Sequence, residues 1–324
     1  MKALVCHALS EDLSGTSLSE VDMPAPGAGE VLIAVRAASL NFPDILMCEG
    51  KYQFKPELPF IVGMEFAGDV VRVGDGVTDW VPGDKVYGGA KTGAFAEYVC
   101  ARAEGLRRVP STYSYSEAAA LGAAYLTAYV ALVRRARIEA GETLLVHGAS
   151  GGVGMAAIEV GKLLGATVIA TTGRRGKMEA LKGSGADHVI NLRDGFRDKV
   201  KALTDGRGAD VIFDPIGGDV FDESTRCIAF DGRLLVIGFM SGRIADIRTN
   251  IPLIKGFSVM GVRAGEYGRQ FPEKGRENQA QVLAWAEKGR IRPRIHIELP
   301  LERAGEALRM MAGRDVIGKI VVTT

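Results

Sequence analysis

The chain has 324 residues, a formal net charge of +1, and 47% hydrophobic and 24% charged residues, which is typical of a globular protein of about two domains. No apolar run approaches the roughly 18 residues of a membrane-spanning helix. The nearly neutral charge gives no general attraction to nucleic acid or anionic lipid. The first residues contain one lysine and no long apolar stretch, which indicates a strand and not a signal peptide. The four cysteines lack the spacing of a disulfide framework or a zinc knuckle, so we expect a cytoplasmic protein.

The first 110 residues are predicted to be rich in β-strands. Short β-branched runs are separated by Gly, Pro and Asp, and they predict strands at 2–7, 31–37, 61–73, 85–87 and 95–101. Strict alternation of apolar and polar residues is weak in these runs. We therefore expect a curved, barrel-like sheet.

Beyond residue 115 the pattern changes to alternating helices and strands. An alanine-rich segment at 116–137 predicts a helix, with Ser116 as the candidate N-cap. Apolar strands then alternate with amphipathic helices. We expect the strands at 143–147, 167–171, 188–191, 210–213, 233–237 and 257–261. This alternation predicts a doubly wound parallel sheet of the Rossmann type, in which six strands make two mononucleotide-binding halves.

The last 50 residues predict two further helix–strand pairs, with helices at 275–288 and 301–313 and strands at 295–299 and 319–323. We expect this tail to return to the first domain. The predicted architecture is an α/β chain with a discontinuous catalytic domain at 1–124 and 264–324. A cofactor domain would occupy 125–263.

Part of a large glycine content, 42 residues, lies in a turn that binds dinucleotides in other proteins. Residues 148–154 read Gly-Ala-Ser-Gly-Gly-Val-Gly and stand between a predicted strand and an apolar helix. Glycines let backbone N–H groups approach a pyrophosphate, and the helix N-terminus adds partial positive charge. The alternative, a turn that only packs strand on helix, explains this combination less well.

The end of the second cofactor-domain strand favours NADPH over NADH. An NAD site places Asp or Glu about 20 residues after the glycine turn, to bind the ribose 2′-hydroxyl. Here that window holds Arg174, Arg175 and Lys177 and no acid. Cations oppose the dipole at a helix start, so an anionic 2′-phosphate accounts for them; a solvated helix start is the alternative.

Six strings resemble a known family. They are residues 40–44 (Leu-Asn-Phe-Pro-Asp), 63–68 (Gly-Met-Glu-Phe-Ala-Gly), 125–129 (Tyr-Leu-Thr-Ala-Tyr), 147–154, 185–191 (Gly-Ala-Asp-His-Val-Ile-Asn) and 214–218 (Asp-Pro-Ile-Gly-Gly). The chain resembles the medium-chain dehydrogenase/reductase superfamily over its whole length, in the zinc-independent quinone oxidoreductase branch related to zeta-crystallin. The resemblance implies a GroES-like catalytic domain and a Rossmann domain.

The resemblance also implies that no metal is bound. Zinc alcohol dehydrogenases of this superfamily hold catalytic zinc with Cys, His and Cys, and the matching positions here are Asn41, Met64 and Ala123. None of these side chains replaces a thiolate or imidazole, and the neighbouring Glu65 alone does not hold zinc. The lobe that binds a structural zinc is replaced by a direct passage through residues 88–93.

Without a Lewis acid, the expected hydride acceptor is already electron-poor, such as a quinone or an enone. The candidate catalytic residues lie in one loop. By resemblance Asn41 lies beside the nicotinamide ribose and the substrate, although it could also be a turn residue. Tyr52 could donate its phenol to a developing oxyanion or simply be packed. Asp44 could orient Asn41 or cap the following turn.

Family resemblance assigns the cofactor contacts position by position. The pyrophosphate, the adenosine phosphate and the nicotinamide each receive a group of residues, with one tail residue reaching the phosphates. At one further position, near the adenosine, the family often has Tyr and this chain has Leu192. The resemblance therefore gives weaker grounds for assigning a cofactor contact to that residue. The assigned residues are Asn41, Thr127, Ser150, Gly151, Gly152, Val153, Gly173, Arg174, Lys177, Leu192, Ile237, Gly238, Phe239 and Arg314.

Three functions remain open. The first is an NADPH-dependent quinone reductase, and the second is an NADPH-dependent reductase of enones or enoyl-CoA thioesters, with a basic segment around residues 263–276 as a CoA contact. The third is an NADPH-binding or RNA-binding protein with little catalysis, for which residues 134–137 form a compact basic run. An apolar edge strand at 257–261 predicts a homodimer, because an unpaired edge promotes association.

Overall fold

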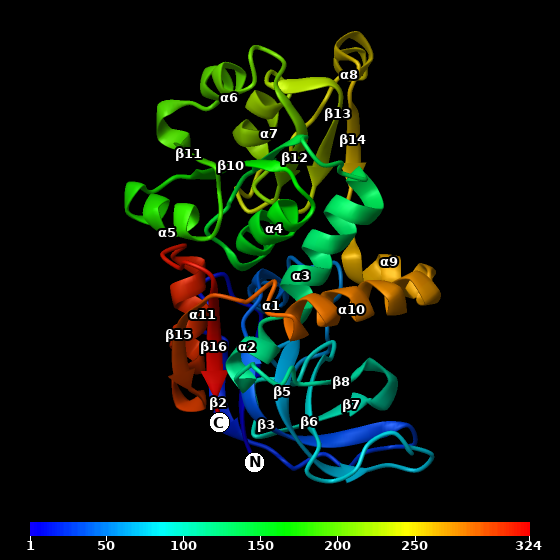
Figure 1. Cartoon of the computed structure of the whole chain (residues 1–324). Coiled ribbons are helices and arrows are strands. Elements are labelled where there is room, and N and C mark those ends of the chain that lie inside the picture. The colour runs from blue at the N-terminus through cyan, green and yellow to red at the C-terminus, as the bar shows by residue number, and fades with distance from the viewer. The chain divides into compact units, whose positions relative to one another are not determined.

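The computed structural model describes all 324 residues, and they form two compact units (Figure 1). Unit 1 comprises Met1–Ala123 and Arg292–Thr324, and unit 2 comprises Ala124–Ile291. The tail from Arg292 onward belongs to unit 1, whereas the boundary expected from the sequence is residue 264. No helix is both long enough and apolar enough to cross a membrane.

The helices α9 (Ala264–Gln270) and α10 (Pro272–Glu287) account for the shifted boundary, because their contacts lie in unit 2. The Trp285 ring packs 5.5 Å from the Tyr129 ring. Arg134 Nε donates to Asn278 Oδ1 at 2.7 Å, and Asn278 is buried. The helical pattern of this segment was visible in the sequence, whereas these partners were not.

Unit 1 is built on two β-sheets. The larger has the order β15-β16-β3-β5-β6-β8, with β7 also paired to β3, and the smaller has the order β2-β1-β4. Its strands are β1 (Lys2–Cys6), β2 (Thr16–Glu20), β3 (Glu30–Ser39), β4 (Phe60–Ile61), β5 (Glu65–Val73), β6 (Lys85–Gly89), β7 (Tyr98–Arg102), β8 (Arg107–Arg108), β15 (Ile295–Pro300) and β16 (Lys319–Thr323). Its helices are α1 (Phe42–Cys48), α2 (Tyr115–Ala119) and α11 (Ala304–Ala312).

The predicted strand at 61–73 is broken by a glycine. Gly63 has φ +102, and a Cβ added there would lie 2.7 Å from the Phe95 backbone nitrogen. The chain therefore leaves β4 and enters the other sheet at Glu65, the first residue of β5. Glu65 pairs with Ser39 at the end of β3, and Ser39 pairs with Val321 of β16. This register brings Glu65 and the start of β16 to the same end of the sheet.

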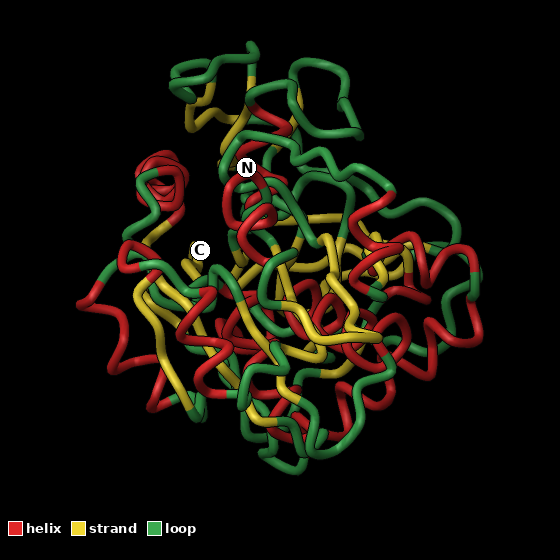
Figure 2. The backbone as a smooth tube through the Cα atoms, turned by 90° about the horizontal axis from the view of Figure 1, so that it is seen from above, coloured by secondary structure: helices red, strands yellow, loops and turns green.

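Unit 2 is a doubly wound parallel sheet, as the sequence predicts. The strand order is β11-β10-β9-β12-β13-β14, and every pair is parallel. The strands are β9 (Thr143–Val146), β10 (Thr167–Thr172), β11 (His188–Asn191), β12 (Ala209–Asp214), β13 (Ile228–Val236) and β14 (Ser258–Gly261). The helices between them are α4 (Gly152–Leu163), α5 (Met178–Gly183), α6 (Arg197–Leu203), α7 (Gly218–Ser224) and α8 (Asn250–Lys255). Figure 2 distinguishes the helices, strands and connecting loops along the backbone.

The predicted helix at 116–137 is three elements. α2 begins after Ser114, whose hydroxyl accepts the Glu117 N–H while the Glu117 carboxylate accepts the Ser114 N–H. This reciprocal capping box makes Ser114 the N-cap, so the prediction of Ser116 was wrong. α3 (Gly122–Tyr129) follows a break at residues 120–121 and continues into a π-helical turn, Val130–Ala136. Short 3₁₀ turns occur at Ala103–Gly105, Arg175–Lys177, Leu192–Asp194 and Leu301–Arg303.

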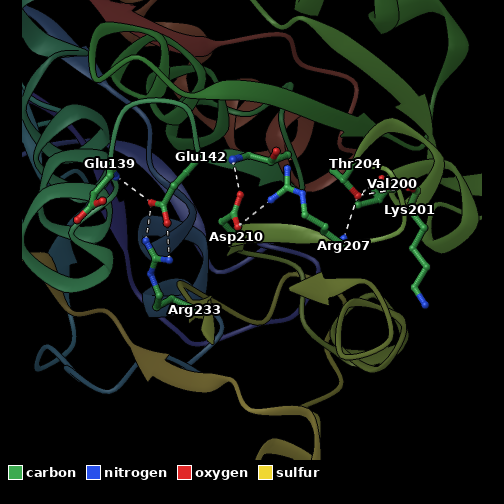
Figure 3. Close-up of polar contacts among 10 residues, drawn as sticks. Glu139, Glu142, Val200, Lys201, Thr204, Arg207, Asp210 and Arg233 are labelled. Atoms are coloured by element: carbon green, nitrogen blue, oxygen red, sulfur yellow. Dashed lines mark hydrogen bonds and ion pairs between the residues drawn. The ribbon is translucent and has the colours of Figure 1, made fainter. Parts of the chain in front are cut away.

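A bidentate ion pair secures β13 to the segment before β9. The Arg233 guanidinium donates to both Glu142 carboxylate oxygens at 2.8 and 2.6 Å, and Glu142 also accepts the Glu139 N–H (Figure 3). Both side chains of the pair are about one-fifth exposed, at 19% and 22%. Nearby, Arg207 approaches Asp210 at 3.8 Å but is 62% exposed. The Arg233 ion pair is therefore short and shielded, and the Arg207 ion pair is long and exposed, so Arg207 serves as the comparison.

Replacing Arg233 with Met should lower the free energy of unfolding by about 2 kcal/mol, because a largely shielded charge-assisted pair is lost and Glu142 keeps only one partner. Arg207→Met should change it by less than about 0.5 kcal/mol. Urea unfolding followed by circular dichroism measures both. Equal losses in the two variants would contradict the assigned role of the Arg233 pair.

Candidate active site

The glycine turn of unit 2 is shaped to admit a phosphate group. Gly148 has φ +55, and a Cβ added to Gly154 would lie 2.5 Å from the Gly148 carbonyl oxygen. The N-cap of α4 is Gly151, which offers no side-chain cap, and the first turn of α4 has no acid. The first N–H groups of a 12-residue helix are therefore available to an anion.

The loops after β12 and β13 lie beside this turn. A Cβ on Gly148 would lie 3.0 Å from the Pro215 ring. The backbone N–H groups of Met240 and Ser241 donate to the carbonyls of Pro215 and Ile216 at 3.0 and 2.9 Å. Parallel strands end at one edge of a sheet, and the gap between β9 and β12 is where the strand order reverses. Ligands bind such sheets at this switch point.

Buried Asp214 holds the loop after β12 in shape. One carboxylate oxygen accepts the N–H groups of Ile216 and Gly217 at 2.8 and 3.0 Å. Burial raises the pKa of Asp214, and these two N–H donors oppose the rise. Gly217 has φ +70, and the Phe239 ring lies within 3.3 Å of where its Cβ would be. The residues assigned by resemblance to the nicotinamide, 237–239, therefore lie next to the glycine loop 217–218.

The basic segment after β10 has an open surface. A Cβ added to Gly173 would meet no atom within 4 Å. Arg174 and Arg175 are exposed, and Arg175 has only a long contact, 3.8 Å, to Asp194. Lys177 is buried at 7% exposure. The segment thus offers two exposed guanidinium groups and one shielded ammonium at the start of α5, which suits an anionic phosphate better than a ribose hydroxyl.

A buried polar cluster forms the corresponding feature of unit 1, and we call its members Asn41, Glu65 and Lys319 the amide–carboxylate–lysine cluster. Lys319 Nζ donates to Asn41 Oδ1 at 2.7 Å and lies 3.6 Å from Glu65 Oε2. Asn41 Nδ2 donates to the same Glu65 oxygen at 2.7 Å. The other oxygen of Glu65 accepts the Ala123 N–H. Glu65 was noticed in the sequence, whereas Lys319 was missed.

Two of the three positions that match zinc ligands of alcohol dehydrogenases by resemblance are linked through Glu65. Asn41 and Ala123 both bond to Glu65, and Met64 precedes it in the chain. These positions present an amide, a thioether and a methyl group. No three His, Cys, Asp or Glu side chains of the chain converge in a way that could hold a metal ion.

Asp44 caps the helix that follows Asn41. Its Oδ2 accepts the Asn41 backbone N–H at 2.8 Å, and its Oδ1 is buried with no hydrogen-bond partner. The carboxylate therefore contacts the backbone and not the side chain of Asn41. Burial raises the pKa of Asp44 to about 7, and the Asn41 N–H and the Lys319 charge oppose the rise.

Tyr52 and Cys48 differ in whether their polar groups can take part in chemistry. Tyr52 is half-buried against the core of unit 1, and its hydroxyl makes no hydrogen bond within the chain. A packed ring with an unused phenol is compatible with both alternatives considered for it. Cys48 is buried, and burial raises the pKa of its thiol, so it is not a reactive thiolate.

The remaining assigned residues lie as follows. Ser150, Gly151, Gly152 and Val153 are half-exposed on the glycine turn, and Ile237 and Gly238 are half-exposed after β13. Thr127 is half-buried on α3, and Leu192 packs against the core of unit 2. Arg314 lies in unit 1, in the turn between α11 and β16.

A doubly wound parallel sheet with an uncapped glycine turn at its switch point is the arrangement with which dinucleotide-binding proteins hold their cofactors. Comparison with known proteins extends this result. Residues 27–111 match the alcohol dehydrogenase GroES-like domain, and residues 152–282 match the zinc-binding dehydrogenase family. The match to the first confirms the expected GroES-like fold of unit 1.

The chain is 39% identical to the quinone oxidoreductase-like protein 2 homolog of Nematostella vectensis, over 100% of this chain and 89% of that protein. Among solved structures, mycobacterial Rv1454c complexed with NADPH matches with a TM-score of 0.93, 28% identity and complete coverage of both chains. The CurK enoyl reductase matches with a TM-score of 0.89 and 27% identity, over 99% of this chain and 98% of that one. The chain therefore belongs to the zinc-independent, quinone oxidoreductase-like branch of the medium-chain dehydrogenases/reductases.

Titration of Asp44 should give the protein a measurable pH dependence. Its folded pKa, about 7, lies above that of an unfolded Asp, near 3.9, so the folded chain binds this proton more tightly. Stability from this group is therefore fully present below about pH 4 and is lost as the pH rises through 7. Between pH 5 and 8 the wild type should lose roughly 2–3 kcal/mol relative to Asp44→Asn, as urea unfolding at each pH would show.

The control is Asp79→Asn, which changes an exposed carboxylate of unit 1. Its stability should stay parallel to that of the wild type over the same range. A constant difference between Asp44→Asn and the wild type from pH 5 to 8 would mean that Asp44 is already ionised when the chain is folded at low pH.

Proposed function

We propose that the chain is an NADPH-dependent oxidoreductase that reduces quinones without a metal. The observation that carries this proposal is the amide–carboxylate–lysine cluster, which links positions that hold zinc in alcohol dehydrogenases. A site without a Lewis acid cannot polarise an alcohol oxygen strongly. It suits an acceptor whose conjugated system takes a hydride with little activation, and a quinone is such an acceptor.

Most of the proposed cofactor contacts lie in unit 2, and two, Asn41 and Arg314, lie in unit 1. Ser150, Gly151, Gly152 and Val153 would hold the pyrophosphate with their backbone N–H groups. Gly173, Arg174 and Lys177 would hold the 2′-phosphate, with Leu192 next to the adenosine. Thr127, Ile237, Gly238 and Phe239 would line the nicotinamide, with Asn41 at the ribose and Arg314 at the phosphates.

Bound NADPH supplies a hydride from its nicotinamide C4. The chain's residues then have two tasks: to hold the acceptor in line and to balance the charge that the hydride adds. Reducing a quinone to a hydroquinone takes one hydride and one proton at each turnover, and the proton is the one that the developing oxyanion accepts. Tyr52 is the proposed donor to the developing oxyanion, because its phenol is unused within the chain.

A second candidate is the reduction of enoyl thioesters, and the likeness to the CurK enoyl reductase favours it. The basic segment on α9 and α10 gives it less support. Arg263 and Arg269 both contact Glu266, at 3.9 and 2.8 Å, and Lys274 stacks over the Phe271 ring. Most of the charge that would meet CoA phosphates therefore already has a partner in the chain.

The non-catalytic alternative has weaker grounds. In the basic run 134–137, Arg134 already bonds to Asn278 and Glu277. No aromatic platform for nucleic-acid bases lies among these residues in the sequence. RNA binding is therefore kept only as an outcome of the acceptor experiment.

Acceptor preference tests the proposed function directly. Purified protein would be mixed with NADPH and, in turn, 9,10-phenanthrenequinone, 1,4-benzoquinone, an alkenal and crotonyl-CoA, with absorbance at 340 nm recorded. We expect kcat/KM for a quinone to exceed that for crotonyl-CoA by tenfold or more. Tyr52→Phe should lower kcat with the alkenal by about 100-fold, since a positioned proton donor contributes this much. A faster thioester would support the second candidate, and no oxidation of NADPH would support the non-catalytic one.

We further propose that two copies pair along β14, the edge strand of unit 2. Three large apolar side chains near this edge are strongly exposed: Phe230 at 83%, Leu253 at 81% and Ile254 at 74%. Phe230 lies against Gly256, so β13 and the end of α8 present one apolar surface. An unpaired edge strand with apolar neighbours favours association with a second copy of the same chain.

Light scattering coupled to size-exclusion chromatography tests this pairing. The wild type should elute as a dimer, and Leu253→Glu should convert it to a monomer because it buries a charge in the proposed contact. Leu203→Glu is the control, since Leu203 is 41% exposed on α6 and lies outside the surface. A monomeric wild type, or a Leu253→Glu variant that stays dimeric, would exclude pairing at this edge.

A further inference from the structure

Lys319 is a lysine in an unusual environment. It begins β16, and its side chain is 6% exposed. Burial lowers the pKa of Lys319, while the charges of Glu65 and Asp44 raise it. Lysine is almost never buried unless it is paired. The hydrogen bond to Asn41 and the negative charges of Glu65 and Asp44 compensate for the removal of this ammonium from water, so Lys319 is held by a small set of polar partners.

The Asn41 carboxamide is fixed from both ends. Nδ2 donates to Glu65 Oε2 at 2.7 Å and to the Ser39 carbonyl at 3.3 Å, so both of its N–H groups are engaged. Oδ1 accepts from Lys319. A flipped amide would turn its oxygen toward the Glu65 carboxylate and its NH₂ toward the Lys319 ammonium. Both contacts would be repulsive, so the two charges select one orientation.

The selected orientation limits what Asn41 can do. An amide oxygen has two acceptor sites, and Lys319 uses one of them. With both N–H groups committed, the carboxamide has no donor left, and any hydrogen-bonding capacity that remains is that of an acceptor at Oδ1. Asn41 can therefore receive a hydrogen bond from a hydroxyl group but cannot donate one to an oxyanion.

Glu65 has no freedom to relax this arrangement. Its Oε1 accepts the Ala123 N–H, and a Cβ added to Gly122 would lie 2.7 Å from that oxygen. The carboxylate is thus held at the start of α3 by the backbone. If the Asn41 amide moved away, Glu65 and Lys319 would each lose their hydrogen bond to it.

We propose that Lys319 is a positioning residue for hydride transfer, acting through the Asn41 carboxamide by holding it as a hydrogen-bond acceptor. This inference rests on the proposed function, since Asn41 is assigned to the reacting end by resemblance. Lys319 itself touches neither cofactor nor substrate in this account. Its effect should therefore vanish when the Asn41 side chain is removed.

A double-mutant cycle with an isotope effect tests the proposal. The variants are Lys319→Met, Asn41→Ala and the double variant, assayed at saturating NADPH and 9,10-phenanthrenequinone. Lys319→Met should lower kcat by about 10- to 100-fold, the scale of a small misplacement of reacting groups. The double variant should match Asn41→Ala within about twofold. The deuterium isotope effect with [4-²H]NADPH, measured for both C4 epimers, should increase in Lys319→Met because hydride transfer becomes slower relative to the other steps.

Lys2→Met is the matched control. Lys2 pairs with Glu302 at 2.7 Å in the same unit, but both side chains are about half exposed. This variant should keep the wild-type kcat and isotope effect. A merely structural role for Lys319 would lower activity in proportion to the folded fraction and leave the isotope effect unchanged, and that result would overturn the proposal. Independent, multiplicative losses in the double variant would also overturn it.

Lys319→Met leaves buried carboxylates uncompensated and could prevent folding, so a second variant is needed. Lys319→Met with Glu65→Gln removes the charge pair together, and buried pairs often tolerate such neutral replacement. We expect this variant to melt near the wild type while its kcat stays reduced. Wild-type kcat in this folded variant would contradict positioning by charge.

One readout does not depend on activity. Hydrogen exchange of the Asn41 side-chain NH₂ can be followed by ¹⁵N nuclear magnetic resonance, with the signals assigned by their absence in Asn41→Ala. Exchange should be at least about tenfold faster in the Lys319→Met, Glu65→Gln variant than in the wild type, because the Lys319 contact with the Asn41 amide is lost and the Glu65 contact is weakened. Unchanged exchange would refute positioning. If the wild type reduces no acceptor but exchange changes as expected, the proposed function fails while the control of Asn41 by Lys319 stands.

Discussion

The Glu65 carboxylate joins segments of unit 1 that are far apart in the chain. One oxygen accepts the N–H group at the start of α3, and the other accepts the Asn41 amide and faces Lys319. The sheet makes this possible, because Glu65 begins β5 opposite the end of β3, and β16 pairs with the other side of β3. Asn41 and Ala123 match zinc-ligand positions of alcohol dehydrogenases by resemblance, and here both bond to this one fixed carboxylate, while Lys319 donates to the Asn41 amide.

The loops of unit 2 are placed by strand direction. Because all six strands of unit 2 are parallel, the glycine turn and the loops after β12 and β13 must emerge at one edge. The Asp214 carboxylate fixes the loop after β12 by accepting the backbone N–H groups of Ile216 and Gly217. The cofactor surface thus follows from topology, and only the details of its loops depend on single side chains. Unit 1 is the reverse case, in which the arrangement depends on a few buried polar contacts.

Features encoded locally were predictable from the sequence. The strands of unit 2 could be located because buried parallel strands are continuous apolar runs, and the glycine turn could be recognised because backbone approach requires glycine. Features set by distant contacts were not predictable. The assignment of α10 to unit 2 depends on the packing of Trp285 on Tyr129, more than 150 residues away. The N-cap of α2 is different, because Ser114 and Glu117 are only three residues apart and form a capping-box pattern that could have been read from the sequence. Lys319 could be recognised only as a charge at the start of an apolar strand, since its partners lie more than 250 residues away.

The central claim is that this scaffold transfers hydride without a metal. The most direct measurement combines elemental analysis with kinetics on a single preparation, before and after dialysis against a strong chelator. The account predicts far less than one zinc per chain and the same rate of NADPH oxidation with 9,10-phenanthrenequinone in both samples. One tightly held zinc per chain, with activity that is lost on chelation and restored by zinc, would contradict it.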